Sequence, residues 1–399
     1  MATVVAEAGS AIPDAAPDVA GPVVNAPIDL PIPVEVAAPG PDLGPNSPVD
    51  APTTMNILAN CTKYTHSNLA SDGGALDWGI RRLAFSPDGK YLVSFGEDGR
   101  AKVWNITATG LTDTGILFTG YNSVYGAISP DGKYVAVGDS ESQVKVYDLL
   151  ASIQFGTSSL KWTLPPDALS PRPYDAFRLQ FTSDGAHLIV VYGGDTNPDP
   201  NQFVVWDLAT QTIVRSINFG YHDVPQAIFP GGYTGAMWVA SRNSVTTDAG
   251  ADLSTVTLID VSQTTPAKAQ VTLAGTINAM AFSPDGTTLA IAFDSSEVSL
   301  WDITSKANIA KLGIPLVVGS SSSSVSAYSL AYTPDGKYVA AGLGDFFGGS
   351  SVNLTVIQQR TSLQKDIDFL PWSMAFAPDG LALAVGERDY GVLLYCRAH

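Results

Sequence analysis

Short apolar segments alternate with a polar turn that repeats along most of the chain. The turn FSPDG at 282–286 has six further versions, which lie at 85–89, 128–132, 181–185, 229–232, 332–336 and 376–380. The last glycines of successive turns are 43 to 54 residues apart, since they stand at 89, 132, 185, 232, 286, 336 and 380. A period of this size is typical of stacked structural repeats.

Each turn joins two short apolar runs, and a third run follows. In the first repeat these runs read RRLAF, YLVSFG and AKVWNI. Proline fixes φ at the start of the turn, aspartate accepts hydrogen bonds from nearby backbone, and glycine adopts the positive φ that the turn needs. Flanking runs rich in Val, Ile, Leu, Phe and Tyr predict β-hairpins.

The third run recurs as VKVYDL, FVVWDL, VTLIDV, VSLWDI, VNLTVI and GVLLYC. With SPDGK before it, this cassette resembles the WD-repeat family of β-propellers over roughly residues 55–399. The resemblance implies an all-β, seven-bladed β-propeller in which each four-stranded blade covers the next. The family's Gly-His pair and its buried Asp-His-Ser-Trp hydrogen-bond set are expected to be missing, because the four histidines do not recur in the strand cassettes.

The same resemblance implies that an N-terminal strand closes the ring by completing the last blade. Residues 55–61, or the continuation 62–66, would then pair with 391–396. This pairing brings Cys61 and Cys396 together, and we predict a disulfide; two unpaired thiols are the alternative. A disulfide favours an oxidising compartment, so we expect an extracytoplasmic protein that is secreted, periplasmic or on the cell surface.

Residues 1–54 differ in composition from the propeller domain at 55–399. They contain eleven prolines and no aromatic residue, Lys or Arg, which predicts an extended Pro-rich arm or linker. Within the arm, strict alternation is typical of a half-buried strand, and it places one apolar side at Ile28, Leu30, Ile32, Val34 and Val36. Because Pro31 and Pro33 restrict such a strand to a sheet edge, the arm could dock on its own propeller or assemble copies head to tail into a filament.

Charge excludes some partners. The net charge of −17 argues against nucleic-acid binding through phosphate neutralisation and against adsorption to anionic membranes. No stretch approaches the roughly 20 apolar residues of a transmembrane segment. The first residues lack the basic and apolar regions of an intact signal peptide.

Common catalytic and cofactor motifs do not occur. The sequence has no HExxH, paired CxxC or GxSxG, so we expect no cofactor and no resident metal. One loop spaces oxygen ligands as a calcium loop does, at Asp195, Asn197, Asp199 and Asn201. It has Pro200 in place of the central glycine and Trp206 in place of the final acid, so an ordinary polar hairpin loop is the alternative.

Large side chains near the starts of the predicted inner strands are the better site signal. Counting four residues back from the aromatic or apolar residue of each turn selects Arg81, Val124, Phe177, Pro225, Asn278, Tyr328 and Trp372. With nearby rings, the candidate binding mouth comprises Trp78, Arg81, Tyr121, Tyr125, Tyr174, Phe177, Tyr221, His222, Tyr328 and Trp372. Such a surface suits peptides, proline-rich segments or sugars. The alternative is that several of these rings only fill the channel or pack between blades.

These patterns favour a non-catalytic interaction or structural module that binds a protein or peptide, including another copy of itself. We find no convergent ionisable groups in the sequence, which agrees with that interpretation. A propeller-type enzyme, such as a lactonase or a sugar-acting hydrolase, is the alternative and would need three or more carboxylates or a metal at the mouth. An intracellular adaptor with free thiols is a third.

Overall fold

The computed structural model describes residues 60–66, 79–122, 124–165, 175–193, 201–219, 223–229, 237–246, 250, 252–262, 268–294, 297–304, 310–317, 325–345, 348–356, 361–367, 370–389 and 391–396. The chain divides into two units, Met1–Thr53 and Thr54–His399, and every described residue belongs to the second. The predicted arm strand from Ile28 to Val36 therefore lies outside the described residues.

The described residues of the second unit form seven four-stranded antiparallel sheets. Sheet 1 contains β2 (Ile80–Phe85), β3 (Tyr91–Gly96), β4 (Arg100–Thr107) and β5 (Gly110–Thr119). Sheet 2 contains β6 (Val124–Ile128), β7 (Tyr134–Asp139), β8 (Val144–Asp148) and β9 (Leu160–Leu164). Sheet 3 contains β10 (Ala176–Phe181), β11 (His187–Tyr192), β12 (Gln202–Asp207) and β13 (Thr212–Asn218).

The remaining sheets follow the same order of strands. Sheet 4 contains β14 (Val224–Phe229), β15 (Trp238–Thr246), β16 (Asp252–Asp260) and β17 (Lys268–Ala274). Sheet 5 contains β18 (Ile277–Phe282), β19 (Thr288–Phe293), β20 (Glu297–Asp302) and β21 (Ala310–Val317). Sheet 6 contains β22 (Ser326–Tyr332), β23 (Tyr338–Asp345), β24 (Gly348–Val356) and β25 (Thr361–Ile367). Sheet 7 contains β26 (Pro371–Phe376), β27 (Ala382–Glu387), β28 (Gly391–Cys396) and β1 (Asn60–Thr65).

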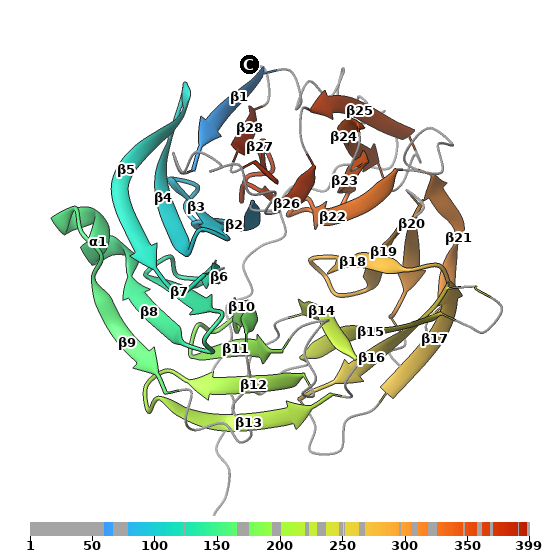
Figure 1. Ribbon diagram of the computed structural model, residues 1–399, viewed down its shortest axis with the longest axis horizontal. Coiled ribbons are helices and arrows are strands. Elements are labelled where there is room, and N and C mark those ends of the chain that lie inside the picture. Colours follow the sequence, from blue (N-terminus) through green and yellow to red (C-terminus); the bar gives the residue numbers. More distant parts are fainter. Residues whose placement is uncertain are drawn as a thin grey trace, which may run out of the picture. The chain divides into compact units, whose positions relative to one another are not determined.

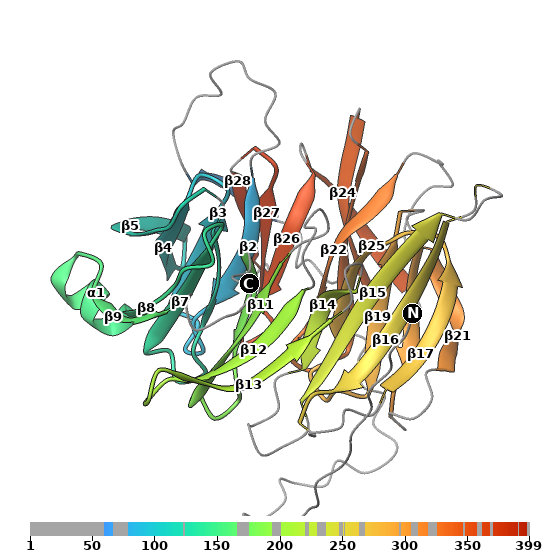
Figure 2. The same ribbon diagram turned by 60° about the horizontal axis from the view of Figure 1, so that its bottom comes forward.

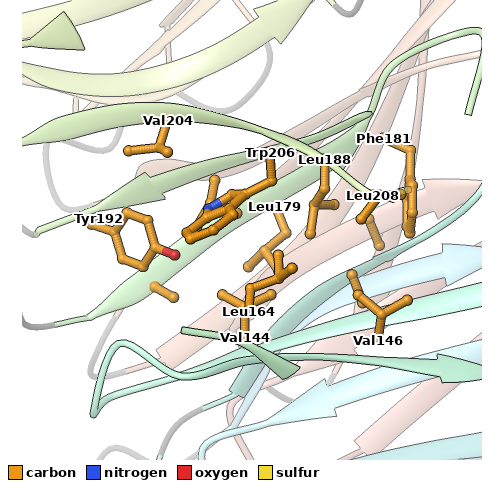
Figure 3. Packing of buried hydrophobic residues seen from close by; sticks show 14 residues of the cluster. Val144, Val146, Leu164, Leu179, Phe181, Leu188, Tyr192, Val204, Trp206 and Leu208 are labelled. Atoms are coloured by element: carbon orange, nitrogen blue, oxygen red, sulfur yellow. The ribbon is translucent and has the colours of Figure 1, made fainter. Parts of the chain in front are cut away.

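Apolar clusters join each sheet to the next, with the first strand of each sheet nearest the centre (Figure 1). Between sheets 2 and 3, Val146 and Leu164 pack with Leu179 and the fully buried Trp206 (Figure 3). A cluster that includes Ile80, Leu92, Val392 and Leu394 joins sheet 7 back to sheet 1. The prediction of an all-β β-propeller is therefore confirmed.

One helix, α1 (Leu149–Phe155), interrupts sheet 2 between β8 and β9. Asp148 caps its start by accepting a hydrogen bond from the Ala151 N–H at 2.8 Å, and Gly156 ends it with a φ of 67°. Both ribbon views place α1 at the outer edge of its sheet (Figures 1 and 2). No helix in the described part of the chain is long and apolar enough to cross a membrane.

The repeated turns have the chemistry that their sequence predicts. In five of them a Ser or Thr hydroxyl donates to the Asp two residues later at 2.6 to 2.7 Å, starting at Ser86, Ser129, Thr182, Ser283 and Thr333. The last glycine of these turns has a φ between 67° and 72°, a conformation that costs glycine little. In these five sheets the turn thus fixes the spacing between the first and second strand.

β1 lies beside β28, with Asn60 paired to Cys396 and Cys61 paired to Tyr395. The two cysteine positions are therefore one residue apart in register rather than directly opposite. Their side chains lie outside the described part of the structure, and the disulfide stays a prediction.

Sheet 1, together with His66 after β1, forms the buried Asp-His-Ser-Trp hydrogen-bond set that we expected to be missing. Trp104 Nε1 donates to Ser94 Oγ at 2.8 Å, and Ser94 Oγ lies 2.7 Å from His66 Nδ1. His66 Nε2 lies 3.4 Å from Asp98 Oδ1. The expectation was wrong for this sheet because His66 follows β1, outside the repeating cassette where a histidine was sought.

Candidate functional site

The first strands of the seven sheets surround a central cavity of about 790 Å³. Residues from β2, β6, β10, β14, β18, β22 and β26 all line it. Each strand therefore contributes side chains to one shared space, which no single repeat could form alone.

A β-bulge near the start of six of these strands places an extra residue toward the cavity. The register shifts fall at Arg81, Phe177, Gln226, Asn278, Tyr328 and Trp372, and all six line the cavity. Bulges redirect side chains in this way and are common beside functional sites. In β6 the pairing is regular and Tyr125 lines the cavity. We call these seven residues the mouth ring.

Arg81 of the mouth ring is neutralised by a neighbour. Its guanidinium forms a salt bridge with Glu97 and lies 4.0 Å from the ring centroid of Trp372. Glu97 also accepts a hydrogen bond from the Gly79 N–H at 2.9 Å. Burial raises the pKa of Glu97, and the positive charge of Arg81 opposes that rise. This pair fixes the mouth where sheets 7 and 1 meet.

Two other arginines, Arg82 and Arg178, line the cavity from sheets 1 and 3. Each follows a bulge residue directly, so they stand at equivalent positions of β2 and β10. Arg178 Nη2 donates to Gln226 Oε1 at 3.4 Å, but its buried Nε has no hydrogen-bond partner. Within the described residues, neither arginine forms an ion pair with a carboxylate.

Burial lowers the pKa of both guanidiniums. For Arg178 the pKa falls to about 9, chiefly through burial and further through the positive charge of Arg82. Burial alone lowers the pKa of Arg82. Because arginine side chains stay protonated at neutral pH in proteins, two like charges face the same cavity.

Five of the ten predicted mouth residues line the cavity, namely Arg81, Tyr125, Phe177, Tyr328 and Trp372. Tyr121 is 55% exposed and is not among the described lining residues. The other four lie outside the described residues: Trp78, Tyr174, Tyr221 and His222. A binding role for all ten stays a prediction.

Counting four residues back from each turn finds a cavity-lining residue in five repeats and misses it in two. In repeat two it selects the fully buried Val124, because β6 lacks the bulge. In repeat four it selects Pro225 in place of Gln226, because the bulge of β14 lies three residues before Phe229 rather than four. The count depends on a bulge at a constant distance from the turn.

The structure also corrects our expectation that ionisable groups do not converge. Arg81, Arg82 and Arg178 all line one cavity. The shared pattern RLAF at 82–85 and RLQF at 178–181 was the available signal. Sequence reasoning missed it because the search concerned carboxylates and histidines.

The described lining residues include no aspartate or glutamate, so the three carboxylates that the enzyme alternative requires are not found there. In the part of the chain that the structure describes, no group of three His, Cys, Asp or Glu side chains could hold a metal. Of the calcium candidates, Asp195, Asn197 and Asp199 lie outside that part. Asn201 is buried, and its Nδ2 donates to the Asp223 carbonyl at 3.2 Å.

Comparison with known proteins agrees with the fold. The WD40 family, described as "WD domain, G-beta repeat", matches residues 70–105, 114–148 and 268–302. Three segments of this β-propeller therefore match the WD40 repeat. Each match includes one of the regular SPDG turns and ends at or next to a third run such as VYD or LWD. The resemblance inferred from the cassette is therefore confirmed.

A curated protein similar to this chain is the mouse "Periodic tryptophan protein 2 homolog". The two are 32% identical over 220 residues, which is 55% of this chain and 21% of the relative. The similarity thus spans about a fifth of the length of that protein.

Proposed function

We propose that this propeller is a non-catalytic interaction module that holds an extended segment of a partner protein in the mouth ring. The observation that supports this most directly is the convergence of side chains from all seven inner strands on one cavity of about 790 Å³. Pockets of this size hold small ligands or a few residues of a peptide. A scaffold role also agrees with the WD-repeat fold.

The mouth ring combines apolar and hydrogen-bonding groups. Tyr125, Phe177, Tyr328 and Trp372 supply rings, which bind peptide side chains with little loss of conformational entropy. Gln226 and Asn278 supply amides that suit a peptide backbone. We infer that the seven sheets are the complete ring in solution, because apolar clusters link each sheet to the next and the seventh back to the first.

Selection of random peptides on the full chain tests this function. We expect selected peptides to compete with one another and to lose at least tenfold in affinity for Asn278→Trp, which fills the cavity. The matched control is Lys337→Trp on a turn, where the lysine side chain is 61% exposed. Circular dichroism checks that both variants fold. Failure to select any peptide, or equal binding by Asn278→Trp, would refute a binding role for the mouth.

An extracytoplasmic location and the Cys61–Cys396 disulfide belong to the same proposal. Their support is the placement of both cysteines on the paired strands β1 and β28. Alkylation of the denatured, unreduced protein followed by mass spectrometry should modify neither cysteine. Modification of both would favour the intracellular adaptor instead.

Head-to-tail self-assembly through the arm is also proposed, on the alternating pattern from Ile28 to Val36. Deletion of residues 1–54 should convert any assembly to single propellers in sedimentation velocity. An unchanged assembly state would rule out this role for the arm.

A further inference from the structure

We propose that Arg82 and Arg178 form an oxyanion subsite within the mouth, which takes the carboxylate or phosphate of an acidic side chain on the bound peptide. This inference rests on the proposed function and specifies the chemical class of the ligand. Its basis is the juxtaposition of two cationic side chains from β2 and β10 in one cavity, without a carboxylate partner among the described residues.

Two acidic groups act on Tyr125 of the mouth ring, namely Glu97 and Asp175, and neither pairs with these arginines within the described residues. Glu97 binds Arg81 and the Gly79 N–H. Asp175, which precedes β10, forms no ion pair with either Arg82 or Arg178 within the described residues, and burial raises its pKa. The guanidinium charges of Arg82 and Arg178 are therefore not neutralised in the described structure.

Such an arrangement is unfavourable for the free protein. A buried charge without a partner loses hydration, and a second like charge in the same cavity adds repulsion. The buried Nε of Arg178 also lacks a hydrogen-bond acceptor. An anion bound between the two guanidiniums would replace the lost hydration, offset the repulsion and accept a hydrogen bond from Arg178 Nε. Binding of the anion is therefore favoured because the anion-free protein is destabilised.

Arginine suits this role in its geometry. Its planar guanidinium donates paired hydrogen bonds to carboxylate and phosphate oxygens. Tyr125 lies on β6, the inner strand between β2 and β10, and Phe177 adjoins Arg178. The subsite therefore favours an acidic ligand residue with an apolar neighbour. The two arginines form this subsite in a protein whose net charge is −17.

Small anions test the subsite without knowledge of the partner. Phenyl phosphate and benzoate, titrated calorimetrically into the full chain, should bind saturably, whereas neutral benzamide should not. Arg82→Gln and Arg178→Gln should each weaken binding at least tenfold, and Arg82→Lys should weaken it less. Lys133→Gln is the control, since that lysine is 58% exposed on a turn. Tighter binding of phenyl phosphate would indicate a phosphorylated residue, and tighter binding of benzoate an Asp or Glu.

Two results would overturn the inference: no saturable binding of either anion, or equal binding by wild type and both glutamine variants with unchanged thermal unfolding. The peptide selection separates this outcome from failure of the proposed function. Neutral peptides that bind wild type and both arginine variants alike, but not Asn278→Trp, would keep the function and remove the oxyanion subsite. Acidic peptides that lose affinity in both arginine variants would support both.

Discussion

The joint between sheets 7 and 1 differs from the joint between sheets 4 and 5. The joint of sheets 4 and 5 is built on apolar side chains such as Trp238, Met280 and Trp301. The joint between sheets 7 and 1, which we call the closing joint, has its own apolar cluster. It also has polar contacts from His66, the residue after β1. His66 reaches Ser94, and the Lys102 ammonium donates to the His66 carbonyl at 3.3 Å.

Chain connectivity explains the difference. Sheets 4 and 5 follow each other in sequence, so their association closes only a short loop. In the closing sheet, Lys63 Nζ donates a hydrogen bond to Asp389 Oδ2 at 2.7 Å, although the two residues are 326 positions apart in the sequence. Loop-closure entropy is larger for the pairing of β1 with β28, and the contact between Lys63 and Asp389 helps to fix the register of that pairing. Between sheets 7 and 1, the polar contact of His66 with Ser94 adds to the apolar cluster.

Removal of β1 should have the largest effect. Deletion of residues 1–66 leaves β28 as an edge strand and removes His66, and we expect a loss of more than about 4 kcal/mol in the free energy of unfolding. Urea denaturation measures this. Deletion of residues 1–54 is the control and should leave the unfolding midpoint unchanged. Equal midpoints for the two deletions would show that the closing strand contributes nothing.

Loss of a buried serine should distinguish the polar network from a single hydrogen bond. Ser94 contacts both Trp104 Nε1 and His66 Nδ1, whereas among the described residues Ser299 accepts from Trp301 Nε1 alone, at 2.9 Å. We expect Ser94→Ala to lower the free energy of unfolding by about 3 kcal/mol and Ser299→Ala by about 1 kcal/mol. Denaturant titration of both variants compares them. A larger effect for Ser299→Ala would contradict the special role of the closing joint.

Glu387 should make the closing sheet sensitive to pH. Its side chain is buried and lies 3.0 Å from the Lys63 ammonium, and burial raises its pKa from 4.5 to about 7 against the influence of Lys63. Because the folded state holds this proton more tightly than the unfolded state, the stabilisation is complete below pH 4.5. It is lost as the pH rises through about 7, and it amounts to about 3 kcal/mol.

Thermal unfolding between pH 5 and pH 8 measures that dependence. The fall in stability with rising pH should be smaller in Glu387→Gln, which has no proton to release. A wild-type slope that persists in the variant would assign the dependence to another group.

The turn aspartates should show the smallest effect and the opposite sign. The hydrogen bond from Ser283 holds the pKa of Asp285 below its ordinary value of 3.8. Its contribution is therefore present above pH 3.8 and is lost as the pH falls below that value. We expect Asp285→Asn, at an exposed turn, to lower the free energy of unfolding at pH 7 by less than about 1 kcal/mol. Circular dichroism during urea titration at pH 7 and pH 3 would test both the size and the sign.

Much of the fold could be predicted because its signals are local. A turn such as FSPDG at 85–89 specifies its own hydrogen bonds, from Ser86 to Asp88 and at Gly89, whatever surrounds it. Repetition of that turn then indicated the stacked sheets. The pairing of β1 with β28 was expected from the family resemblance, since no local pattern links residues so far apart.

The candidate site was predictable only in part. Five mouth residues followed from a count along the repeats, because the same bulge recurs at the same distance from the turn. Gln226 was missed because the bulge of β14 lies one residue closer to the turn than in the other strands. His66 was missed because it follows β1, outside the repeating cassette where a histidine was sought, and meets its partner Ser94 only in the folded protein.

The sequence by itself determined the hairpins and their number of repeats, because turn geometry and strand alternation depend on neighbouring residues. Only the tertiary structure decided that Arg82 and Arg178, nearly a hundred residues apart, share a cavity whose described lining residues include no carboxylate. Charge balance at such a place depends on which strands meet at the centre, and that is a property of the assembled ring.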